Sequence, residues 1–156
     1  MKKLFSLIVI LVAFSSCQDE VKFNNPGFQA FRDDVLFKGV DVRAYKSTSG
    51  ALRIVALALD EEVELKITSS NPGTYVLGTS ESKTATYINT KDNGYLYYKT
   101  GTDIGDGEVK ITDNNLGTVT GTFRFNARNV FNNPLGGELV NFQYGAFYKI
   151  PVIPEP

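Results

Sequence analysis

The sequence predicts an all-β fold, with a single domain built as an antiparallel β-sandwich or flattened barrel of about nine or ten strands. From about residue 28 onward, short runs of β-branched and aromatic residues are separated by Gly, Asn, Asp or Pro. Apolar residues at helical spacing are scarce. The 11 Phe and 8 Tyr supply a core that hydrophobic burial alone must stabilise, because the chain has only 1 Cys.

The first predicted strands precede residue 60. Three short runs are candidates for the earliest strands: Phe28–Arg32, Val35–Phe37 and Val40–Tyr45. The segment Leu52–Leu59 is apolar on both faces beyond its second residue, which predicts a central strand covered on two sides. A buried helical turn is the alternative for this segment.

Two segments alternate between apolar and polar residues, which is typical of strands with one buried face. In the first, Val63, Leu65 and Ile67 alternate with polar or charged residues, and Pro72-Gly73 ends the run. The second, Thr118–Arg128, has an apolar face made of Val119, Gly121, Phe123, Phe125 and Ala127. A register shift of one residue would expose that face, so we expect the register to be strongly specified.

Turn signals connect the remaining predicted strands. Lys91-Asp92-Asn93-Gly94 contains an Asn-Gly pair, whose positive φ angles would join Ala85–Asn89 to Tyr95–Thr100 as a hairpin. Asp113–Gly117 would join Glu108–Thr112 to the long strand in the same way. The last predicted strands are Leu139–Tyr144 and Ala146–Ile150, which Pro151 and Pro154 would stop.

The N-terminus has the features of a secretory signal. Basic residues at Lys2 and Lys3 precede an apolar run, Leu4–Phe14. A membrane-spanning helix needs roughly 20 apolar residues, whereas the apolar part of a signal peptide needs about 7–15. We therefore expect residues 1–16 to be a removable signal peptide, with a buried helix as the alternative.

The residues that follow resemble a lipid-attachment sequence. Phe14-Ser15-Ser16-Cys17 resembles the lipobox of bacterial lipoproteins, with Phe14 where leucine is usual. The resemblance implies that Cys17 becomes the acylated N-terminus, and that several acyl chains hold the protein on a membrane. A plain signal peptide with an incidental cysteine is the alternative, and it would leave an unpaired thiol.

The short acidic tag Gln18-Asp19-Glu20 resembles the surface-export signal of lipoproteins from Bacteroidota. The expected location is the outer membrane, lipid-anchored, with the protein on the cell surface or facing the periplasm. A solvated linker is the alternative for the tag. We expect residues 17–27 to form the acylated N-terminus and linker.

Composition limits the remaining functions. Without residues 1–16 the chain has 140 residues (156 minus 16), which suits one domain over residues 28–153. Loss of Lys2 and Lys3 leaves 14 basic against 17 acidic residues, a net charge of −3, and the arginines are dispersed, so we expect no nucleic-acid partner. The absence of histidine excludes a Ser-His-Asp triad and an imidazole zinc site.

Clusters of acidic residues offer only weak enzymatic candidates. They are Asp33 and Asp34; Asp60, Glu61 and Glu62; and Asp103, Asp106 and Glu108. Such pairs could serve a glycosidase, but turn positions explain them better, and no tryptophan is present to stack on a sugar. Thr102–Glu108 resembles a calcium loop, yet Ile104 stands where an oxygen ligand is needed. We expect no enzymatic activity, metal or cofactor.

The densest aromatic patch contains Tyr95, Tyr97 and Tyr98. Strand alternation places Tyr95 and Tyr97 on one face and Tyr98 on the other. Cross-strand packing explains these residues adequately. The alternative is that Tyr95 and Tyr97 are exposed and bind a protein or glycan partner, because tyrosine combines apolar area with a polar tip.

Several short motifs together resemble a known family. They are Phe23-Asn24, Pro26-Gly27-Phe28-Gln29-Ala30, Gly73-Thr74-Tyr75, Gly121-Thr122-Phe123-Arg124-Phe125 and Gly145-Ala146-Phe147. They resemble a family of small Bacteroidota lipoproteins catalogued as a domain of unknown function. The resemblance implies an envelope location and an all-β fold, with no activity or site residue.

The functional expectation is a lipid-anchored cell-envelope protein that acts as a non-catalytic binding or assembly module. One alternative is a lipocalin-like carrier, because a small barrel can enclose an apolar ligand. A carbohydrate-active enzyme is a further alternative, and it depends on the acidic clusters alone.

Overall fold

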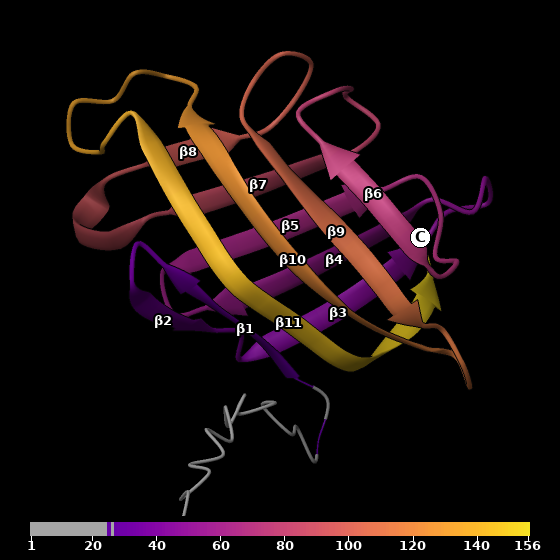
Figure 1. Ribbon diagram of the computed structural model, residues 1–156. Coiled ribbons are helices and arrows are strands. Elements are labelled where there is room, and N and C mark those ends of the chain that lie inside the picture. The colour runs from indigo at the N-terminus through magenta and orange to yellow at the C-terminus, as the bar shows by residue number, and fades with distance from the viewer. Residues whose placement is uncertain (1–24, 26) are drawn as a thin grey trace, which may run out of the picture.

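The computed structural model describes Asn25 and residues 27–156, and in this part of the chain the protein is built from strands (Figure 1). The strands are β1 (Gly27–Arg32), β2 (Val35–Lys38), β3 (Asp41–Lys46), β4 (Leu52–Ala58), β5 (Glu61–Ile67), β6 (Gly73–Leu77), β7 (Thr84–Asn89), β8 (Leu96–Lys99), β9 (Asp106–Asp113), β10 (Thr118–Asn129) and β11 (Leu139–Pro154). The predicted all-β fold is confirmed, with 11 strands in place of nine or ten. None of the described helices is long and apolar enough to cross a membrane.

Several predictions concern segments outside the described residues. These segments contain the expected signal peptide, Cys17 and the tag Gln18-Asp19-Glu20. Lipid attachment and export therefore stay predictions from the sequence.

The strands form one continuous sheet that folds into two layers (Figure 1). One layer has the strand order β2-β1-β11-β10-β9-β6 and the other has the order β3-β4-β5-β7-β8. The layers join at two places, where Val152 of β11 pairs with Ala44 of β3 and where Arg128 of β10 pairs with Lys99 of β8. Figure 1 shows β9, β10 and β11 crossing in front of the second layer. This arrangement is a sandwich or flattened barrel, and the β11–β3 contact is parallel where only antiparallel pairs were predicted.

Aromatic side chains occupy the space between the layers. Eight of them are at most 4% exposed: Phe28, Phe37, Tyr87, Tyr98, Phe123, Phe125, Phe142 and Phe147. The ring centroids of Phe125 and Phe142 are 4.6 Å apart, and those of Phe28 and Phe123 are 4.7 Å apart. Both pairs lie within the first layer, and Tyr87 of the second layer reaches across to Phe142, with ring centroids 5.3 Å apart, so burial of these rings holds the layers together.

The predicted inner face of β10 is confirmed, since its five residues are all buried. Gly121 stands on this face because the neighbouring strands approach it closely. A Cβ atom at this position would collide with the carbonyl oxygen of Lys110 and would lie 2.5 Å from Cζ of Phe147. A larger residue would therefore separate β10 from β9 or displace the ring.

The prediction that β4 is covered on both faces is wrong. Its residues alternate, with Leu52, Ile54 and Ala56 buried, while Val55 is half-buried and Leu57 is 39% exposed. The sandwich has only two layers, so each strand turns one face to the interior and the other outward. The apolar residues on both faces of β4 do not indicate a third layer.

The prediction of two separate C-terminal strands is also wrong. Tyr144 has a φ of 52°, and β11 continues through this irregularity and past Pro151. Along β11, the last residue that pairs with β1 is Tyr148 and the first that pairs with β3 is Val152. Pro151 lies between these two residues. The missing N–H group therefore removes no hydrogen bond with β1 or β3.

Two turns show where positive φ is needed. Lys91–Asn93 forms a 3₁₀ turn in which Asp92, with a φ of 55°, takes the left-handed conformation, whereas Gly94 has a φ of −81°. The predicted Asn-Gly hairpin turn is therefore wrong, although β7 and β8 do pair as expected. At the β1–β2 turn, Asp33 and Asp34 have φ values of 46° and 65°, as a tight two-residue hairpin requires.

Candidate functional site

The candidate site is centred on the two predicted tyrosines of β8. Tyr97 lies on the outer face, and Tyr95 precedes the strand and is 49% exposed. Tyr98 is buried, and Leu96 packs against the core, as the alternation predicted. The rings of Tyr95 and Tyr97 are nearly parallel, with an interplanar angle of 8° and centroids 6.5 Å apart.

A third ring, from a distant part of the chain, joins this pair. Phe131 lies in the connection between β10 and β11, and its centroid is 6.3 Å from that of Tyr95 and 5.7 Å from that of Tyr97. Phe131 is 63% exposed. We call Tyr95, Tyr97 and Phe131 the aromatic face. Phe131 was not predicted, although an aromatic residue within an Asn-, Pro- and Gly-rich loop is a signal that could have identified it.

A buried amide holds the loop that carries Phe131. The side chain of Asn129 donates to the carbonyl oxygens of Asn133 and Gly137, at 3.0 and 3.3 Å, and accepts from the Asn133 N–H at 3.2 Å. Asn129 is only 7% exposed, so these bonds replace those it would make with water. The loop therefore has a defined conformation at its base.

Hydrogen bonds also connect this loop to the strand that carries the tyrosines. Asn133 Nδ2 donates to the Tyr95 carbonyl oxygen at 2.9 Å, and the Val130 N–H donates to the Tyr97 carbonyl oxygen at 3.0 Å. These bonds to the backbone of Tyr95 and Tyr97 hold the loop that carries Phe131 against the segment that carries the tyrosines. A partner that bound them would have little loop entropy to remove.

One ion pair lies next to the aromatic face. Lys99, two residues beyond Tyr97, contacts Glu81, and this contact together with the Thr102 N–H lowers the pKa of the Glu81 carboxyl group. Burial raises the pKa of the Tyr97 phenol further above neutral pH, where this hydroxyl is protonated and can donate a hydrogen bond. The face thus combines apolar rings with a neutral polar group.

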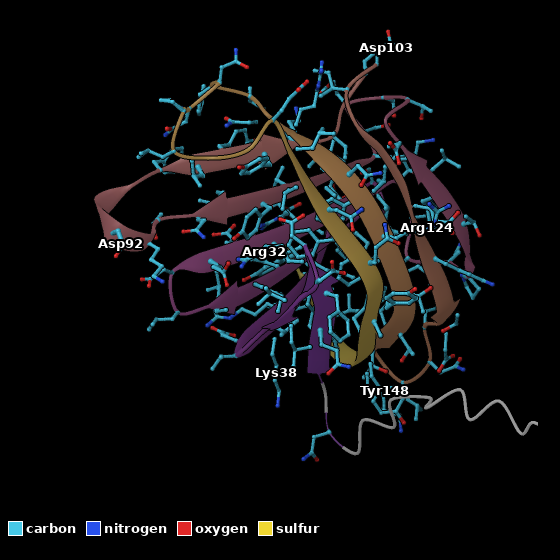
Figure 2. All side chains as sticks on the ribbon, turned by 60° about the vertical axis from the view of Figure 1, so that its left-hand side comes forward. Arg32, Lys38, Asp92, Asp103, Arg124 and Tyr148 are labelled. Atoms are coloured by element: carbon cyan, nitrogen blue, oxygen red, sulfur yellow. The ribbon has the colours of Figure 1, made fainter. Side chains whose placement is uncertain are left out.

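The acidic clusters are distributed over different elements. Asp33 and Asp34 lie in the β1–β2 turn, Asp60 lies in the β4–β5 turn, and Glu108 on β9 pairs with Arg124, labelled in Figure 2, at 3.3 Å. Asp106 accepts a hydrogen bond from Asn126 at 2.9 Å. In the part of the chain that the structure describes, no group of three or more His, Cys, Asp or Glu residues could hold a metal ion.

Glu61 belongs to a network that links the two layers. Arg32 of β1, labelled in Figure 2, pairs with Glu61 of β5 and donates to the Tyr87 hydroxyl at 2.5 Å. The Tyr87 hydroxyl donates to Glu61 and accepts from Asn89 at 3.0 Å. Burial raises the pKa of Tyr87. These contacts explain Glu61 as a structural residue joining the N-terminal hairpin to the second layer.

Comparison with known proteins gives one match. Neither the characterised proteins nor the solved structures gave a significant match to the chain. The model of a family described as a domain of unknown function (DUF6252) matches residues 24–151, which is most of the chain and includes the aromatic face. The chain therefore belongs to the DUF6252 family.

Proposed function

We propose that this protein is a lipid-anchored module of the bacterial cell envelope that binds a protein partner through its aromatic face and catalyses no reaction. The observation that carries the binding proposal is that the exposed rings of Tyr95 and Phe131 lie next to the half-buried Tyr97, while the buried Asn129 fixes the loop that carries Phe131. The lipobox-like sequence that ends at Cys17 supports the anchor. The acidic tag after Cys17 supports a position on the cell surface.

The chemistry of the aromatic face suits a protein interface. Complete burial of a large apolar side chain contributes about 1.5–3 kcal/mol, and Tyr95 and Phe131 still expose about half of their surface or more. Tyr and Phe are enriched in interface cores, where they add large contact areas with few rotatable bonds. Lys99 beside the face already pairs with Glu81, so this charge adds less desolvation cost on binding than an unpaired one would.

Two other functions receive less support. A carrier would need interior space for its ligand, and the eight buried aromatic side chains occupy the region between the layers. A glycosidase would need two facing carboxylates, whereas Glu61 and Glu108 pair with arginines on other strands. We therefore place the contact surface on the outside of the sandwich.

The anchor is tested by the substitution Cys17→Ala in the full chain. We expect the wild type to fractionate with membranes and to carry acyl groups on its mature N-terminus by mass spectrometry. The variant should lose both properties, because the thiol is the attachment point. A wild type without acyl mass, or a variant that stays in the membrane fraction, would contradict the lipid anchor.

Surface display is tested separately with Asp19→Ala and Glu20→Ala combined. We expect less digestion by protease added to intact cells, with unchanged digestion after lysis. Equal digestion of the intact cells would remove the export role of the tag while leaving the anchor unaffected.

The binding proposal is tested by cross-linking in intact cells, comparing wild type with Phe131→Ala. Tyr144→Ala is the matched control, because Tyr144 is 83% exposed and lies outside the aromatic face. We expect a specific cross-linked protein that Phe131→Ala loses and Tyr144→Ala keeps. Identical cross-linked products for all three chains would refute the proposal. Binding of the purified protein to a glycan array, lost in Phe131→Ala alone, would instead identify a carbohydrate ligand.

A further inference from the structure

The first layer of the sandwich ends in two edge strands, β2 and β6, which differ in how they are protected. Edge strands expose unpaired backbone groups, and many proteins protect them with charged side chains. β2 follows Asp33 and Asp34 and ends in the exposed Lys38. Charges therefore border both ends of the β2 edge.

The β6 edge has no such protection. β6 carries no charged residue, and it lies within residues 67–80, where no Asp, Glu, Lys or Arg occurs. Thr74 is exposed and Val76 is 49% exposed. Among the described strands, β6 pairs with β9 alone, along one edge.

The backbone of β6 is suited to accept another strand. In an antiparallel ladder, alternate residues direct their N–H and C=O groups away from the neighbouring strand. The Val76 carbonyl accepts a long hydrogen bond, 3.4 Å, from the Thr79 hydroxyl, which places it outside the ladder with β9. By the same alternation, the backbone groups of Thr74 also point to the free edge.

We propose that β6 is a self-association site, at which a second copy of this chain adds its own β6 in antiparallel orientation. Such a contact uses the same strand on both copies, so it closes into a dimer about a two-fold axis. It brings no like charges together, because β6 has none. The charges bordering β2 oppose the alternative β6–β2 contact, which would grow into an open chain of copies.

The size of the contact predicts its strength. Pairing of two five-residue strands buries less than the roughly 1,200–2,000 Å² of a standard interface, so the dimer is weak in dilute solution. Confinement to a membrane would raise the local concentration of the copies and favour pairing. This last point rests on the proposed lipid anchor, whereas the contact itself does not.

Disulfide trapping tests the contact directly. Three two-fold registers are available, centred on Thr74, Tyr75 or Val76. The register centred on Thr74 places Thr74 of one copy opposite Thr74 of the other. The register centred on Tyr75 places Thr74 opposite Val76, and the register centred on Val76 places Val76 opposite Val76. Paired strands bring Cα atoms into the range of a disulfide bond. The variants Thr74→Cys and Val76→Cys, each alone and in an equimolar mixture, therefore sample all three registers.

The experiment uses the full chain carrying Cys17→Ser, so that the introduced thiol is the only one and the result is independent of acylation. The matched control is Leu36→Cys on β2, because Leu36 is 55% exposed against 49% for Val76 and the substitution leaves Lys38 in place. Mild oxidation should give a disulfide-linked dimer from Thr74→Cys alone, from Val76→Cys alone, or only from their mixture, according to the register, and only background from the β2 control. Equal yields from β2 and β6, or no dimer from any β6 sample, would overturn the proposal.

A charge placed on the edge gives a second test. We expect Val76→Lys, combined with Thr74→Cys, to lose any dimer that forms through position 74, while circular dichroism shows that the strands remain. Val76→Lys alone should likewise move wild-type dimer to monomer in sedimentation at high protein concentration. Dimers that survive the substitution in both measurements would show that the copies associate elsewhere.

Discussion

Phe125 and Phe131 are both phenylalanines near the end of β10, and we predict losses of stability of very different size when each is replaced by alanine. Phe125 is 1% exposed, and its ring is 4.6 Å from that of Phe142. Phe125→Ala should lower the free energy of unfolding by about 3–5 kcal/mol, through lost burial and the cavity that remains. Phe131 is 63% exposed. With about a third of its surface buried, Phe131→Ala should cost only roughly 0.5–1 kcal/mol.

Urea denaturation followed by tyrosine fluorescence or circular dichroism measures both values. The transition midpoint should fall strongly for Phe125→Ala and slightly for Phe131→Ala, with unchanged slopes. The contrast matters for function, because the aromatic face is a binding surface only if its rings are dispensable for folding. If Phe131→Ala destabilised the protein as much as Phe125→Ala, Phe131 would be a packing residue and the binding proposal would lose its basis.

Three further predictions concern a crowded glycine, a buried amide and a buried tyrosine. In urea titrations, Gly121→Ala should lower the free energy of unfolding by about 1–3 kcal/mol, because the site is crowded. The control Gly137→Ala should cost under about 0.5 kcal/mol, because its added methyl group meets nothing closer than 3.5 Å. Similar losses for the two variants would contradict the close approach of the strands at Gly121. Asn129→Ala should lower the free energy of unfolding by about 1–3 kcal/mol and speed amide hydrogen exchange in residues 130–138, because it leaves backbone groups of the loop without their hydrogen-bond partner. Unchanged exchange in this loop would refute the role of Asn129 in fixing it. Burial raises the pKa of Tyr87, so the unfolded chain releases this proton at lower pH than the folded chain, and stability should decline as pH rises above about 10. Tyr87→Phe should flatten that decline, and an unaltered slope would show that Tyr87 is not its source.

Short-range patterns predicted most of the strands. Alternation over Thr118–Arg128 identified the inner face of β10, because an apolar face forces one register. The same principle separated Tyr97 from Tyr98 on β8. β6 was missed because Pro72-Gly73 signals a turn, while the strand that begins there depends on pairing with β9.

Errors occurred where tertiary contacts decide the outcome. Leu52–Leu59 is apolar on both faces, yet only the fold determines how many layers cover a strand. Pro151 would end an isolated strand, but β11 changes neighbours at that point and tolerates it. The Asn-Gly pair after β7 did not form the expected turn, because the connection is longer and Asp92 takes the positive φ.

The sequence by itself determined the all-β class, the inner faces of the amphipathic strands and the exclusion of histidine chemistry, because each depends on composition or on a period of two residues. It also supports the assignment of Cys17 as an attachment point. Only the tertiary structure brought Phe131 beside Tyr95 and Tyr97, and only it left β6 at an open edge. Both features depend on contacts between residues 30 or more positions apart, such as those of β6 with β9 and of Tyr97 with Phe131. Such contacts follow from the pairing of whole strands and not from local preference.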